Sequence, residues 1–282
     1  MRGGGQALTY REICARLRKA GIESAEWDAS LLIEHFCKER LDLVPLAPEK
    51  DYDSPALAKA VERRASRYPL QYIIGEWHFF RQVYEVTPDC LIPRSDTEIL
   101  VEEAIRRLPE GALFADLCTG SGCIAISVLA ERPDTRAIAL EKFEKTLALA
   151  ERNAAKNAVR DRFSPLLADV LDPDCLGNEA KLDAILSNPP YIRSDVVRTL
   201  EPEPSAEPHA ALDGGTDGLI FYRAILQNLS RLLRPNGFLL LEIGFDQAAQ
   251  VLEIARKIGF DECRVIRDYG GNDRVIYLKR QG

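Results

Sequence analysis

Four consecutive residues, Asn188, Pro189, Pro190 and Tyr191, combine groups that can hold a planar NH2 group. The two prolines restrict the backbone and remove two N–H donors. Asn188 offers a side-chain carbonyl as acceptor, Pro189 offers its main-chain carbonyl, and Tyr191 offers a flat apolar face. An NH2 group has two hydrogens to donate, so the segment predicts a site for an amide or a nucleobase, with Asn188, Pro189 and Tyr191 as the catalytic residues. A plain Pro-Pro turn is the structural alternative.

A second segment, residues 116–122, has the sequence Asp-Leu-Cys-Thr-Gly-Ser-Gly. Glycines let the main chain turn tightly and approach a ligand, and a helix that begins there directs N–H groups at it. The spacing is not Gly-x-Gly-x-x-Gly, and no Lys-Ser/Thr pair follows as in a phosphate loop. The loop therefore suits an uncharged part of a ligand better than a triphosphate, although a tight turn without a ligand is an alternative. The binding residues it predicts are Cys118, Thr119, Gly120, Ser121 and Gly122.

Two acidic residues between these segments follow apolar runs. Glu141 comes after residues 137–140, where an acid can accept both hydroxyls of a ribose. Asp169 comes after residues 165–167 and can accept from the exocyclic amine of adenine, with Val170 against the ring. A surface position beside Lys142 is the alternative for Glu141, and a helix cap is the alternative for Asp169.

All these positions lie at the ends of strand-like runs, and amphipathic helical stretches separate most of the runs. The runs cover residues 113–117, 137–140, 165–167, 182–186, 238–243, 264–266 and 275–278. Alternating strands and helices predict an α/β fold with a mostly parallel sheet and helices on both faces. Ligands of such sheets bind beyond the carboxyl ends of the strands, so we expect the four segments to form one site.

The chain before residue 95 has a different pattern. Thr9 and Glu12 have capping-box spacing, Ser54-Pro55 is typical of a helix start, and apolar residues recur at helical spacing. The stretch after residue 76 is aromatic and β-branched with turn residues inside, which predicts a hairpin. The sequence thus predicts a small all-α domain over residues 1–76, a β-hairpin linker over 77–94 and an α/β domain over 95–282.

The composition disfavours several classes of protein. The chain is 46% hydrophobic and 29% charged, as in ordinary globular proteins, and no apolar run approaches the ~18 residues of a membrane span. Its start lacks the apolar stretch of a secretory signal, so we expect a cytoplasmic protein without a membrane partner. The seven cysteines and three histidines are not clustered, and no metal site is predicted. The net charge of -7 does not favour direct binding of nucleic acid.

The motifs resemble those of the class I methyltransferases that bind S-adenosylmethionine, whose fold is Rossmann-like and seven-stranded. The Asn-Pro-Pro-Tyr set is shared by members that methylate adenine in DNA, guanine in rRNA or glutamine in proteins. Other segments resemble the peptide chain release factor N5-glutamine methyltransferases (the HemK-like family) in particular. These are residues 69–77, 91–98, 213–219, 241–244 and 271–275, and the resemblance covers nearly the whole chain in the family's order.

The resemblance implies an activity and a role for each motif. The enzyme would transfer a methyl group from S-adenosylmethionine to the side-chain amide of the glutamine in the Gly-Gly-Gln motif of bacterial class I release factors, leaving S-adenosylhomocysteine. Residues 118–122, Glu141, Asp169, Val170 and Asn188 would bind the cofactor. Residues 188–191 would hold the substrate amide. Residues 1–76 carry no chemistry-bearing motif, so we expect them to recognise the protein substrate, and a purely stabilising role is the alternative.

This sequence departs from the family pattern at two positions of the cofactor site. Cys118 stands where the family usually has glycine, and Glu141 stands where it usually has aspartate. Neither change removes the required chemistry, but both bear on cofactor affinity. The tail also contains Gly4-Gly5-Gln6, which repeats the family's target tripeptide and which we interpret as a coincidence.

Two other functions stay open at this point. An amino-methyltransferase acting on adenine or guanine of nucleic acid would use the same pocket for a flipped base, although the acidic α/β part disfavours it. A module that only holds the cofactor is disfavoured by the intact segment at 188–191. For the favoured function we expect catalysis by positioning, with the two acceptors stabilising the positive charge that grows on nitrogen and with no dedicated general base.

Overall fold

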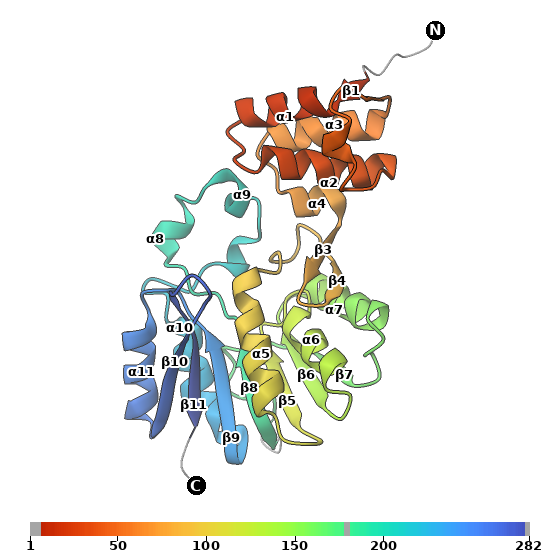
Figure 1. Ribbon diagram of the computed structural model, residues 1–282. Helices are drawn as coiled ribbons and strands as arrows, with labels where there is room; N and C mark the ends of the chain where they lie inside the picture. The colour runs from red at the N-terminus through yellow and green to blue at the C-terminus, as the bar shows by residue number, and fades with distance from the viewer. Residues whose placement is uncertain (1–6, 178–180, 280–282) are drawn as a thin grey trace. The chain divides into compact units, whose positions relative to one another are not determined.

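The computed structural model describes residues 7–177 and 181–279, and the chain forms two compact units (Figure 1). The first unit comprises residues 1–76 together with 201–206, and the second comprises 77–200 and 207–282. The Gly4-Gly5-Gln6 tripeptide lies outside the described residues. No helix in the described part of the chain is both long enough and apolar enough to cross a lipid bilayer.

The first unit is a small helical bundle, as predicted. Its helices are α1 (Tyr10–Lys19), α2 (Ala25–Cys37), α3 (Pro55–Ala65), α4 (Leu70–Ile74) and α9 (Pro202–Ser205), with the short helix η1 (Val44–Leu46). Thr9 and Glu12 form the expected capping box, and the Ser54 hydroxyl accepts from the Leu57 N–H. Two-residue strands, β1 (Leu8–Thr9) and β2 (Asp51–Tyr52), also pair, which the sequence pattern does not indicate.

A buried arginine explains why residues 201–206 belong to the first unit. The Arg64 guanidinium donates to the Asp28 carboxylate at 2.7 Å and to Glu203 at 3.1 Å. Arg67 also bonds to Glu203 at 2.5 Å. Arg64 and Asp28 are both almost fully buried, and a buried charge is tolerated only where it is paired. The ion pairs of the Glu203 carboxylate with Arg64 and Arg67 therefore hold α9 against the helical bundle.

The second unit is built on the predicted seven-stranded sheet. Its strands, in the order in which they pair, are β10 (Glu262–Arg267), β11 (Asp273–Lys279), β9 (Leu233–Glu242), β8 (Leu182–Ser187), β5 (Leu113–Leu117), β6 (Arg136–Glu141) and β7 (Phe163–Leu167). All neighbours are parallel except β11, which runs antiparallel to both β9 and β10. Together with the helical bundle and the hairpin described below, this α/β sheet is the fold class that the sequence predicts.

Helices cover both faces of the sheet because side chains alternate along each strand. On one face, Phe114 and Leu240 pack with α5 (Glu98–Arg107), α6 (Cys123–Glu131) and α7 (Glu144–Lys156). On the other, Ala115 and Leu241 pack with α10 (Ile220–Ala224), the π-helical η4 (Ile225–Leu229) and α11 (Ala248–Lys257). The remaining short helices are η2 (Ser95–Thr97), α8 (Ser194–Val197), η3 (His209–Ala211) and η5 (Ser230–Leu232).

The predicted hairpin consists of β3 (Glu76–Phe79) and β4 (Gln82–Glu85). Side chains of the α/β unit hold it: Glu98 accepts from the Phe80 N–H at 2.8 Å, and Asn153 bonds to both the N–H and the carbonyl of Glu85. Arg152 adds an ion pair with the Glu85 carboxylate at 2.9 Å. The chain that follows the hairpin is thereby directed towards the start of η2.

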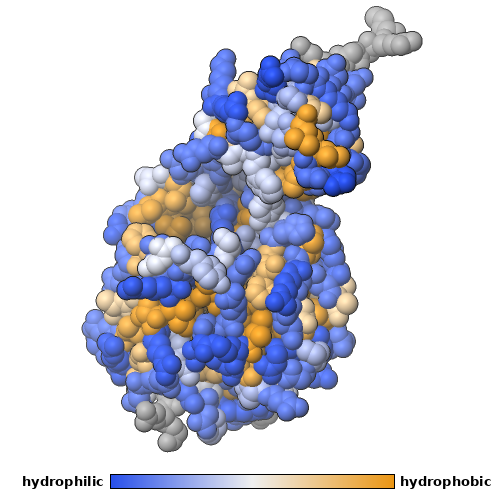
Figure 2. Space-filling model, viewed as in Figure 1, coloured by the Kyte–Doolittle hydropathy of each residue, from blue (hydrophilic) through white to orange (hydrophobic). Residues whose placement is uncertain are grey.

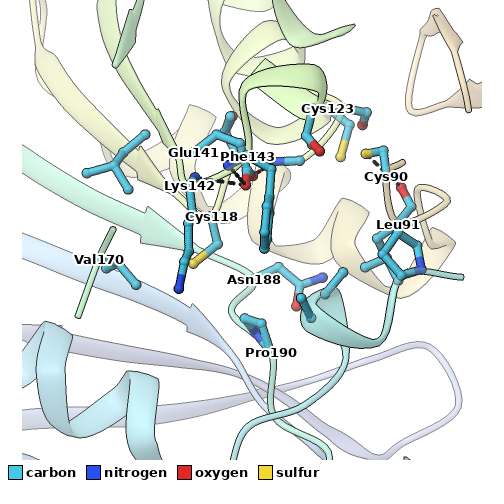
Figure 3. Close-up of a pocket in the computed structure, with 18 of the residues that line it drawn as sticks. Cys90, Leu91, Cys118, Cys123, Glu141, Lys142, Phe143, Val170, Asn188 and Pro190 are labelled. Carbon is cyan, nitrogen blue, oxygen red and sulfur yellow. Dashed lines mark hydrogen bonds between the residues drawn. The ribbon is translucent and has the colours of Figure 1, made fainter. Parts of the chain in front are cut away.

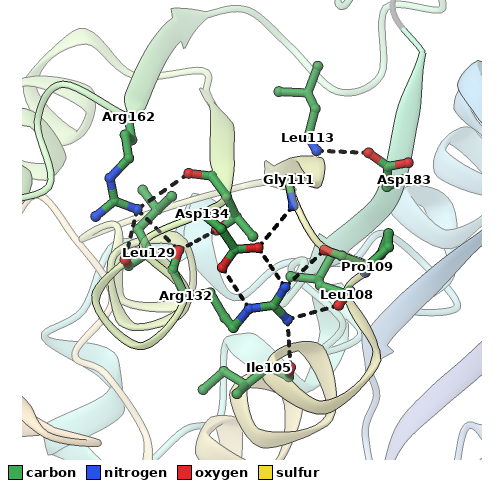
Figure 4. Close-up of polar contacts among 11 residues, drawn as sticks. Ile105, Leu108, Pro109, Gly111, Leu113, Leu129, Arg132, Asp134, Arg162 and Asp183 are labelled. Carbon is green, nitrogen blue, oxygen red and sulfur yellow. Dashed lines mark hydrogen bonds and ion pairs between the residues drawn. The ribbon is translucent and has the colours of Figure 1, made fainter.

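Two arginines connect the loops at the amino ends of β5 and β6 (Figure 4). Arg132 donates to the carbonyls of Ile105, Leu108 and Pro109 and to both oxygens of Asp134. Arg162 donates to the carbonyls of Leu129, Arg132 and Thr135. These donors satisfy carbonyl groups at the ends of α5 and α6 that have no partner within their own helices.

Candidate active site

A cavity of about 330 Å³ lies at the carboxyl edge of the sheet, where the strand order reverses between β5 and β8. This is the size of a small-molecule site, in the place where such sheets bind ligands. Most of the residues predicted from the sequence line it, and Figure 3 shows several of them around the opening. They are Cys118, Thr119, Gly120, Ser121, Glu141, Asp169, Val170, Asn188 and Pro190. Gly122, Pro189 and Tyr191 lie next to these residues in the chain but do not line the cavity.

The loop after β5 is held by a buried aspartate. The Asp116 carboxylate accepts from the Thr119 hydroxyl at 2.6 Å and from the Ala125 N–H at 3.1 Å, both through Oδ2. Burial raises the pKa of Asp116 to about 7, against the effect of these two bonds. Gly120 and Gly122 adopt φ angles of 57° and 83°, which favour glycine. The N–H groups of Thr119, Gly120 and Gly122 donate within the protein, to Leu140, Glu141 and Thr119, so the loop is closed tightly before α6 starts.

Cys118 adopts the same left-handed backbone region, with φ of 59°, although it carries a side chain. Such a conformation costs an L-residue ~1–2 kcal/mol relative to the right-handed one. Burial also raises the pKa of the Cys118 thiol well above its usual value, so it is a neutral, weakly polar wall of the cavity. The side chain therefore adds volume to the cavity wall at the expense of backbone strain.

The carboxylate of Glu141 is almost fully buried at the end of β6. One oxygen accepts from the Gly120 N–H at 3.1 Å, and the other accepts from the N–H groups of Lys142 and Phe143 at 2.9 and 3.1 Å. Burial raises its pKa, and the three N–H groups oppose that rise. Oε1 already accepts two bonds and Oε2 accepts one, so the carboxylate is rigidly oriented and one acceptor site, on Oε2, is left for a hydroxyl group.

Asp169 lies at the other side of the same opening. The Lys142 ammonium pairs with one of its oxygens at 2.8 Å, and the Leu171 N–H donates to the other at 3.0 Å. Burial acts to raise the pKa of Asp169, but these two contacts outweigh burial and lower the pKa. The carboxylate is therefore ionised at neutral pH. Val170 is buried beside it, as expected for an apolar wall, and the exposed part of Asp169 can still accept from a ligand.

The segment 188–191 follows β8 with a defined orientation. Asn188 Nδ2 donates to the Thr97 hydroxyl oxygen at 3.2 Å, so the NH2 end of the side chain is occupied and the Oδ1 end is available. Within residues 7–177 and 181–279, no group donates a hydrogen bond to the Pro189 carbonyl. The Tyr191 hydroxyl donates to Glu242 Oε1 at 3.4 Å. The segment therefore presents acceptors rather than donors.

A loop from a distant part of the sequence fixes this segment from outside. Ile192 exchanges backbone bonds with the loop: its N–H donates to the Leu212 carbonyl at 2.9 Å and its carbonyl accepts from Gly214 at 2.8 Å. Side chains at Gly214 or Gly218 would meet the Tyr191 backbone at 2.8 and 2.5 Å, so both positions require glycine. The Gln247 amide also donates to the Tyr191 carbonyl at 2.9 Å.

Several residues that line the cavity were not among the predicted site residues. Those from the segment before α5 are Asp89, Cys90, Leu91, Ile92, Pro93, Arg94 and Thr97, and others include Phe143, Pro208, Ala211, Asp213 and Phe221. Glu207 ties the first group together, because its carboxylate accepts from the Ile92 N–H at 3.0 Å and pairs with Arg94. Part of this set falls in residues 91–98 and 213–219, which resemble segments of a known family but whose sequence alone predicts no individual role.

No cluster of three or more His, Cys, Asp or Glu side chains suited to a metal ion lies in the described part of the chain. The acidic groups of the site instead bond to backbone N–H groups, hydroxyls or lysine. The site therefore offers the kinds of protein group that bind organic ligands: ordered acceptors, backbone N–H groups and apolar walls.

Comparison with known proteins first defines the class. Residues 95–200 match the methyltransferase small domain family, and residues 9–75 match the PrmC N-terminal domain family. A solved methyltransferase from Pyrococcus furiosus has the same fold, with a TM-score of 0.52 and 18% identity over 71% of this chain and 89% of that one. Together with the cavity at the carboxyl edge of the sheet, these matches identify the chain as a methyltransferase.

Curated relatives then define the family. The release factor glutamine methyltransferase of Geobacter sulfurreducens is 40% identical over 92% of this chain and 91% of its own length. That of Moorella thermoacetica is 39% identical over 96% of both. The chain belongs to the release factor glutamine methyltransferase family, which confirms the resemblance found in the sequence.

Proposed function

We propose that the protein methylates the side-chain amide nitrogen of a glutamine in bacterial class I release factors, within their Gly-Gly-Gln motif, with S-adenosylmethionine as the methyl donor. The observation that carries the proposal is the orientation of Asn188. Its NH2 group is committed to Thr97, so Oδ1 is available to accept one hydrogen of an amide NH2. The proposed acceptor of the second hydrogen is the Pro189 carbonyl, which accepts no bond from the described residues, although Pro189 does not itself line the cavity. Family membership supports the choice of release factors as substrates.

The residues around the cavity fit S-adenosylmethionine. The Glu141 carboxylate has a free acceptor site on Oε2 for a ribose hydroxyl, and Val170 with Asp169 provides an apolar wall and an acceptor for adenine. Residues 118–121 line the cavity just before α6, and the buried Ser121 hydroxyl has no hydrogen-bond partner among the described residues. The bound cofactor would supply a sulfonium methyl group, which is already a strong electrophile.

Because the donor needs no activation, the task of the protein is to position the acceptor. An amide nitrogen is a weak nucleophile, since its lone pair is delocalised into the carbonyl. Asn188 Oδ1 and the Pro189 carbonyl would fix the plane of the amide in line with the methyl group. Their partial negative charges would also stabilise the positive charge that grows on the nitrogen. The proton of the methylated amide is then acidic enough to leave to solvent without a dedicated base.

The surface around the opening favours a protein substrate. The large apolar residues exposed on the α/β unit lie at or just after the carboxyl ends of its strands or on the short helices that follow them: Phe143, Leu167, Val196, Ile220, Phe245 and Tyr269. In the space-filling view, apolar side chains gather near α8 (Figure 2). Exposed apolar groups concentrated around one opening are typical of protein-binding surfaces, whereas a nucleic-acid site would offer lysine and arginine.

The helical unit is proposed to recognise the release factor. It has no chemistry-bearing motif, but it exposes three large apolar residues, Trp27, Leu43 and Leu46, and Leu46 is 76% exposed. Trp27 also lines a shallow groove on this unit, together with Ser30, Glu34, Arg40, Leu41, Asp42 and Pro45. A Gly-Gly-Gln loop alone offers little surface, so additional contacts of this kind would supply affinity.

The proposal is tested by incubating the enzyme with labelled S-adenosylmethionine and a purified class I release factor. Labelling is expected, and replacing the glutamine of the Gly-Gly-Gln motif by alanine in the release factor should abolish it. A parallel reaction with DNA or rRNA should give no label. Transfer to nucleic acid, with none to the release factor, would instead establish the alternative amino-methyltransferase.

A further inference from the structure

The loop between β10 and β11 holds a polar cluster that the proposed mechanism does not use. Residues 271–275, at the end of this loop and the start of β11, resemble a segment of the family, but the sequence alone predicts no role for them. Because β11 runs antiparallel to β9, the start of β11 lies at the carboxyl edge of the sheet. The cluster therefore lies at the same edge of the sheet as the candidate active site.

Asp268 fixes the direction of the Arg274 side chain within this cluster. Its Oδ1 accepts from the Asn272 N–H at 2.9 Å, and its Oδ2 accepts from Arg274 Nε at 3.2 Å and from Nη2 at 3.0 Å. The two side chains are only 5% and 12% exposed. The loop is also tight, because the Gly271 N–H donates to the Asp268 carbonyl at 2.9 Å. Arg274 is therefore held in one direction, unlike an exposed arginine.

The Arg274 guanidinium reaches beyond its own loop to the turn η2. Its Nη2 pairs with Asp96 Oδ2 at 3.1 Å, so one guanidinium bridges the carboxylates of two segments that are distant in sequence. A guanidinium suits this task because its planar fork presents several N–H groups in fixed directions. The residue after η2 is held as well, because the Glu98 carboxylate accepts from the Phe80 N–H at 2.8 Å. The turn is thus anchored by its side chains from two directions.

The turn η2 carries the residue that orients Asn188. Thr97 follows Asp96 directly, is 1% exposed, and accepts from Asn188 Nδ2 at 3.2 Å through its hydroxyl oxygen. The Thr97 N–H donates to the Arg94 carbonyl at 3.0 Å, which closes the turn. Among residues 7–177 and 181–279, no second group bonds to the Asn188 side chain. The direction of the Asn188 amide therefore depends on where η2 places Thr97.

We propose that Arg274 is a positioning residue for methyl transfer: it anchors Asp96, fixes η2, and so places the Thr97 hydroxyl that leaves Asn188 Oδ1 available to the substrate amide. The inference rests on the proposed function for its substrate. Without the ion pair, η2 can shift, and the Asn188 NH2 group loses its acceptor. The Asn188 amide can then rotate and offer a donor to a substrate NH2 group that is itself a donor.

The first test measures methyl transfer by Asp96→Ala and by Arg274→Gln. Turnover should fall ~10- to 100-fold in both, the size of effect expected when a substrate-positioning group is misplaced. Affinity for S-adenosylmethionine should be unchanged, because neither Asp96 nor Arg274 lines the cavity. The Asp96 side chain is 49% exposed, so Asp96→Ala should fold even if Arg274→Gln does not.

Arg267→Gln is the matched control. Arg267 is an arginine of the same pair of strands, but its ion pair, with Asp273 at 3.2 Å, stays within them and does not reach η2. Its turnover and its cofactor affinity should equal those of the wild type.

Variants of Thr97 separate positioning from a general loss of structure. Thr97→Val removes the acceptor for Asn188, so it should lower turnover at least as much as Asp96→Ala does. Adding Asp96→Ala to Thr97→Val should then cause no further loss, because both substitutions act through one contact. Wild-type turnover by Asp96→Ala would overturn the inference. So would equal losses of turnover and cofactor affinity, or fully additive losses in the double variant.

A measurement without substrate keeps the inference separate from the proposed function. The side-chain NH2 resonances of Asn188, assigned by their absence in Asn188→Asp, should exchange with solvent faster in Asp96→Ala than in the wild type, and as fast as in Thr97→Val. Arg267→Gln should keep the slow exchange. If the wild type methylates no release factor, the proposed function fails, and this comparison alone decides on the positioning role. Equal exchange in Asp96→Ala and the wild type would refute that role.

Discussion

The two ends of the same sheet use their polar groups in opposite ways. At the amino end, Arg132 and Arg162 donate hydrogen bonds to backbone carbonyls, and Arg132 also donates to Asp134 (Figure 4). At the carboxyl end, Asp116 Oδ1, Ser121 Oγ and Glu242 Oε2 are buried without partners in the described residues. Buried polar groups normally have hydrogen-bond partners. The unpaired groups therefore lower the stability of the fold at the carboxyl end, where the site lies, whereas the hydrogen bonds at the amino end raise it.

The pKa shifts of the acidic groups follow the same division. The Arg132 guanidinium and the Gly111 N–H lower the pKa of Asp134 well below its usual range. Burial raises the pKa of both Asp116 and Glu242 to about 7. One end of the sheet is thus stabilised by an ionised carboxylate, while at the other end ionisation opposes folding. The experiments below either break this contrast or make it quantitative.

The largest effect is expected from Asn188→Ala. Removing one of two acceptors for the amide should lower kcat by a factor of ~10²–10³, as for other preorganised groups that act in the transition state. Cofactor affinity should fall much less, and steady-state kinetics with a direct binding assay would check both. Asn157→Ala removes an amide that bonds to the carbonyls of Val83 and Asn153 away from the cavity, and it should leave kcat unchanged. Equal losses of binding and turnover in Asn188→Ala would contradict the assigned role.

Arg132→Ala, at the amino end of the sheet, should lower the stability of the protein and leave its turnover unchanged. It removes charge-assisted bonds to three carbonyls and to Asp134, and the free energy of unfolding should fall by ~2–4 kcal/mol. Urea unfolding would measure the loss, and the turnover of the protein that remains folded should be normal. Arg106→Ala, an exposed partner of Glu103, should cost under ~1 kcal/mol. A large loss of turnover in Arg132→Ala would mean that the two ends of the sheet are coupled.

The pH dependence of stability should differ in sign between the two ends. Asp116 and Glu242 have folded-state pKa values raised above those of the unfolded chain, so the folded state binds more protons and stability should decline as pH rises from about 4 to 7. Glu242→Gln should reduce that decline. Asp134 has a lowered pKa, so its contribution is present above pH ~4 and is lost in more acidic solution. Unfolding followed from pH 3 to 8 for wild type, Glu242→Gln and Asp134→Asn would resolve these terms.

The smallest effect is expected from Cys118→Gly. Glycine adopts φ near 59° without penalty, so the substitution should raise the free energy of unfolding by ~1 kcal/mol, partly offset by the entropy of the unfolded chain. Thermal unfolding would measure it, and calorimetric titration would show whether the lost side chain changes cofactor affinity. Cys118→Ala, which keeps the Cβ atom, should not be stabilised.

Much of this organisation follows from the sequence, because local patterns determine it. The strand-like runs, the glycine loop, the helical spacing and the carboxyl-end rule were enough to predict the sheet, the helical bundle and a common location for residues 118–121, 141, 169–170, 188 and 190. Features that depend on contacts distant in sequence were missed. Thr97 and Glu242 are 91 and 54 residues away from Asn188, and no local periodicity relates them.

The close approach of Gly214 and Gly218 to Tyr191 bears on how the enzyme can evolve or be redesigned. On that side the Tyr191 backbone has no space for even one added methyl group. Accommodating a bulkier acceptor, such as an already methylated amide, would therefore require trimming residues on the cavity side, at Phe143 or Phe221, rather than loosening the loop behind it. Neither the glycines nor Tyr191 lines the cavity, so the two glycines fix the backbone of the segment 188–191 from outside it.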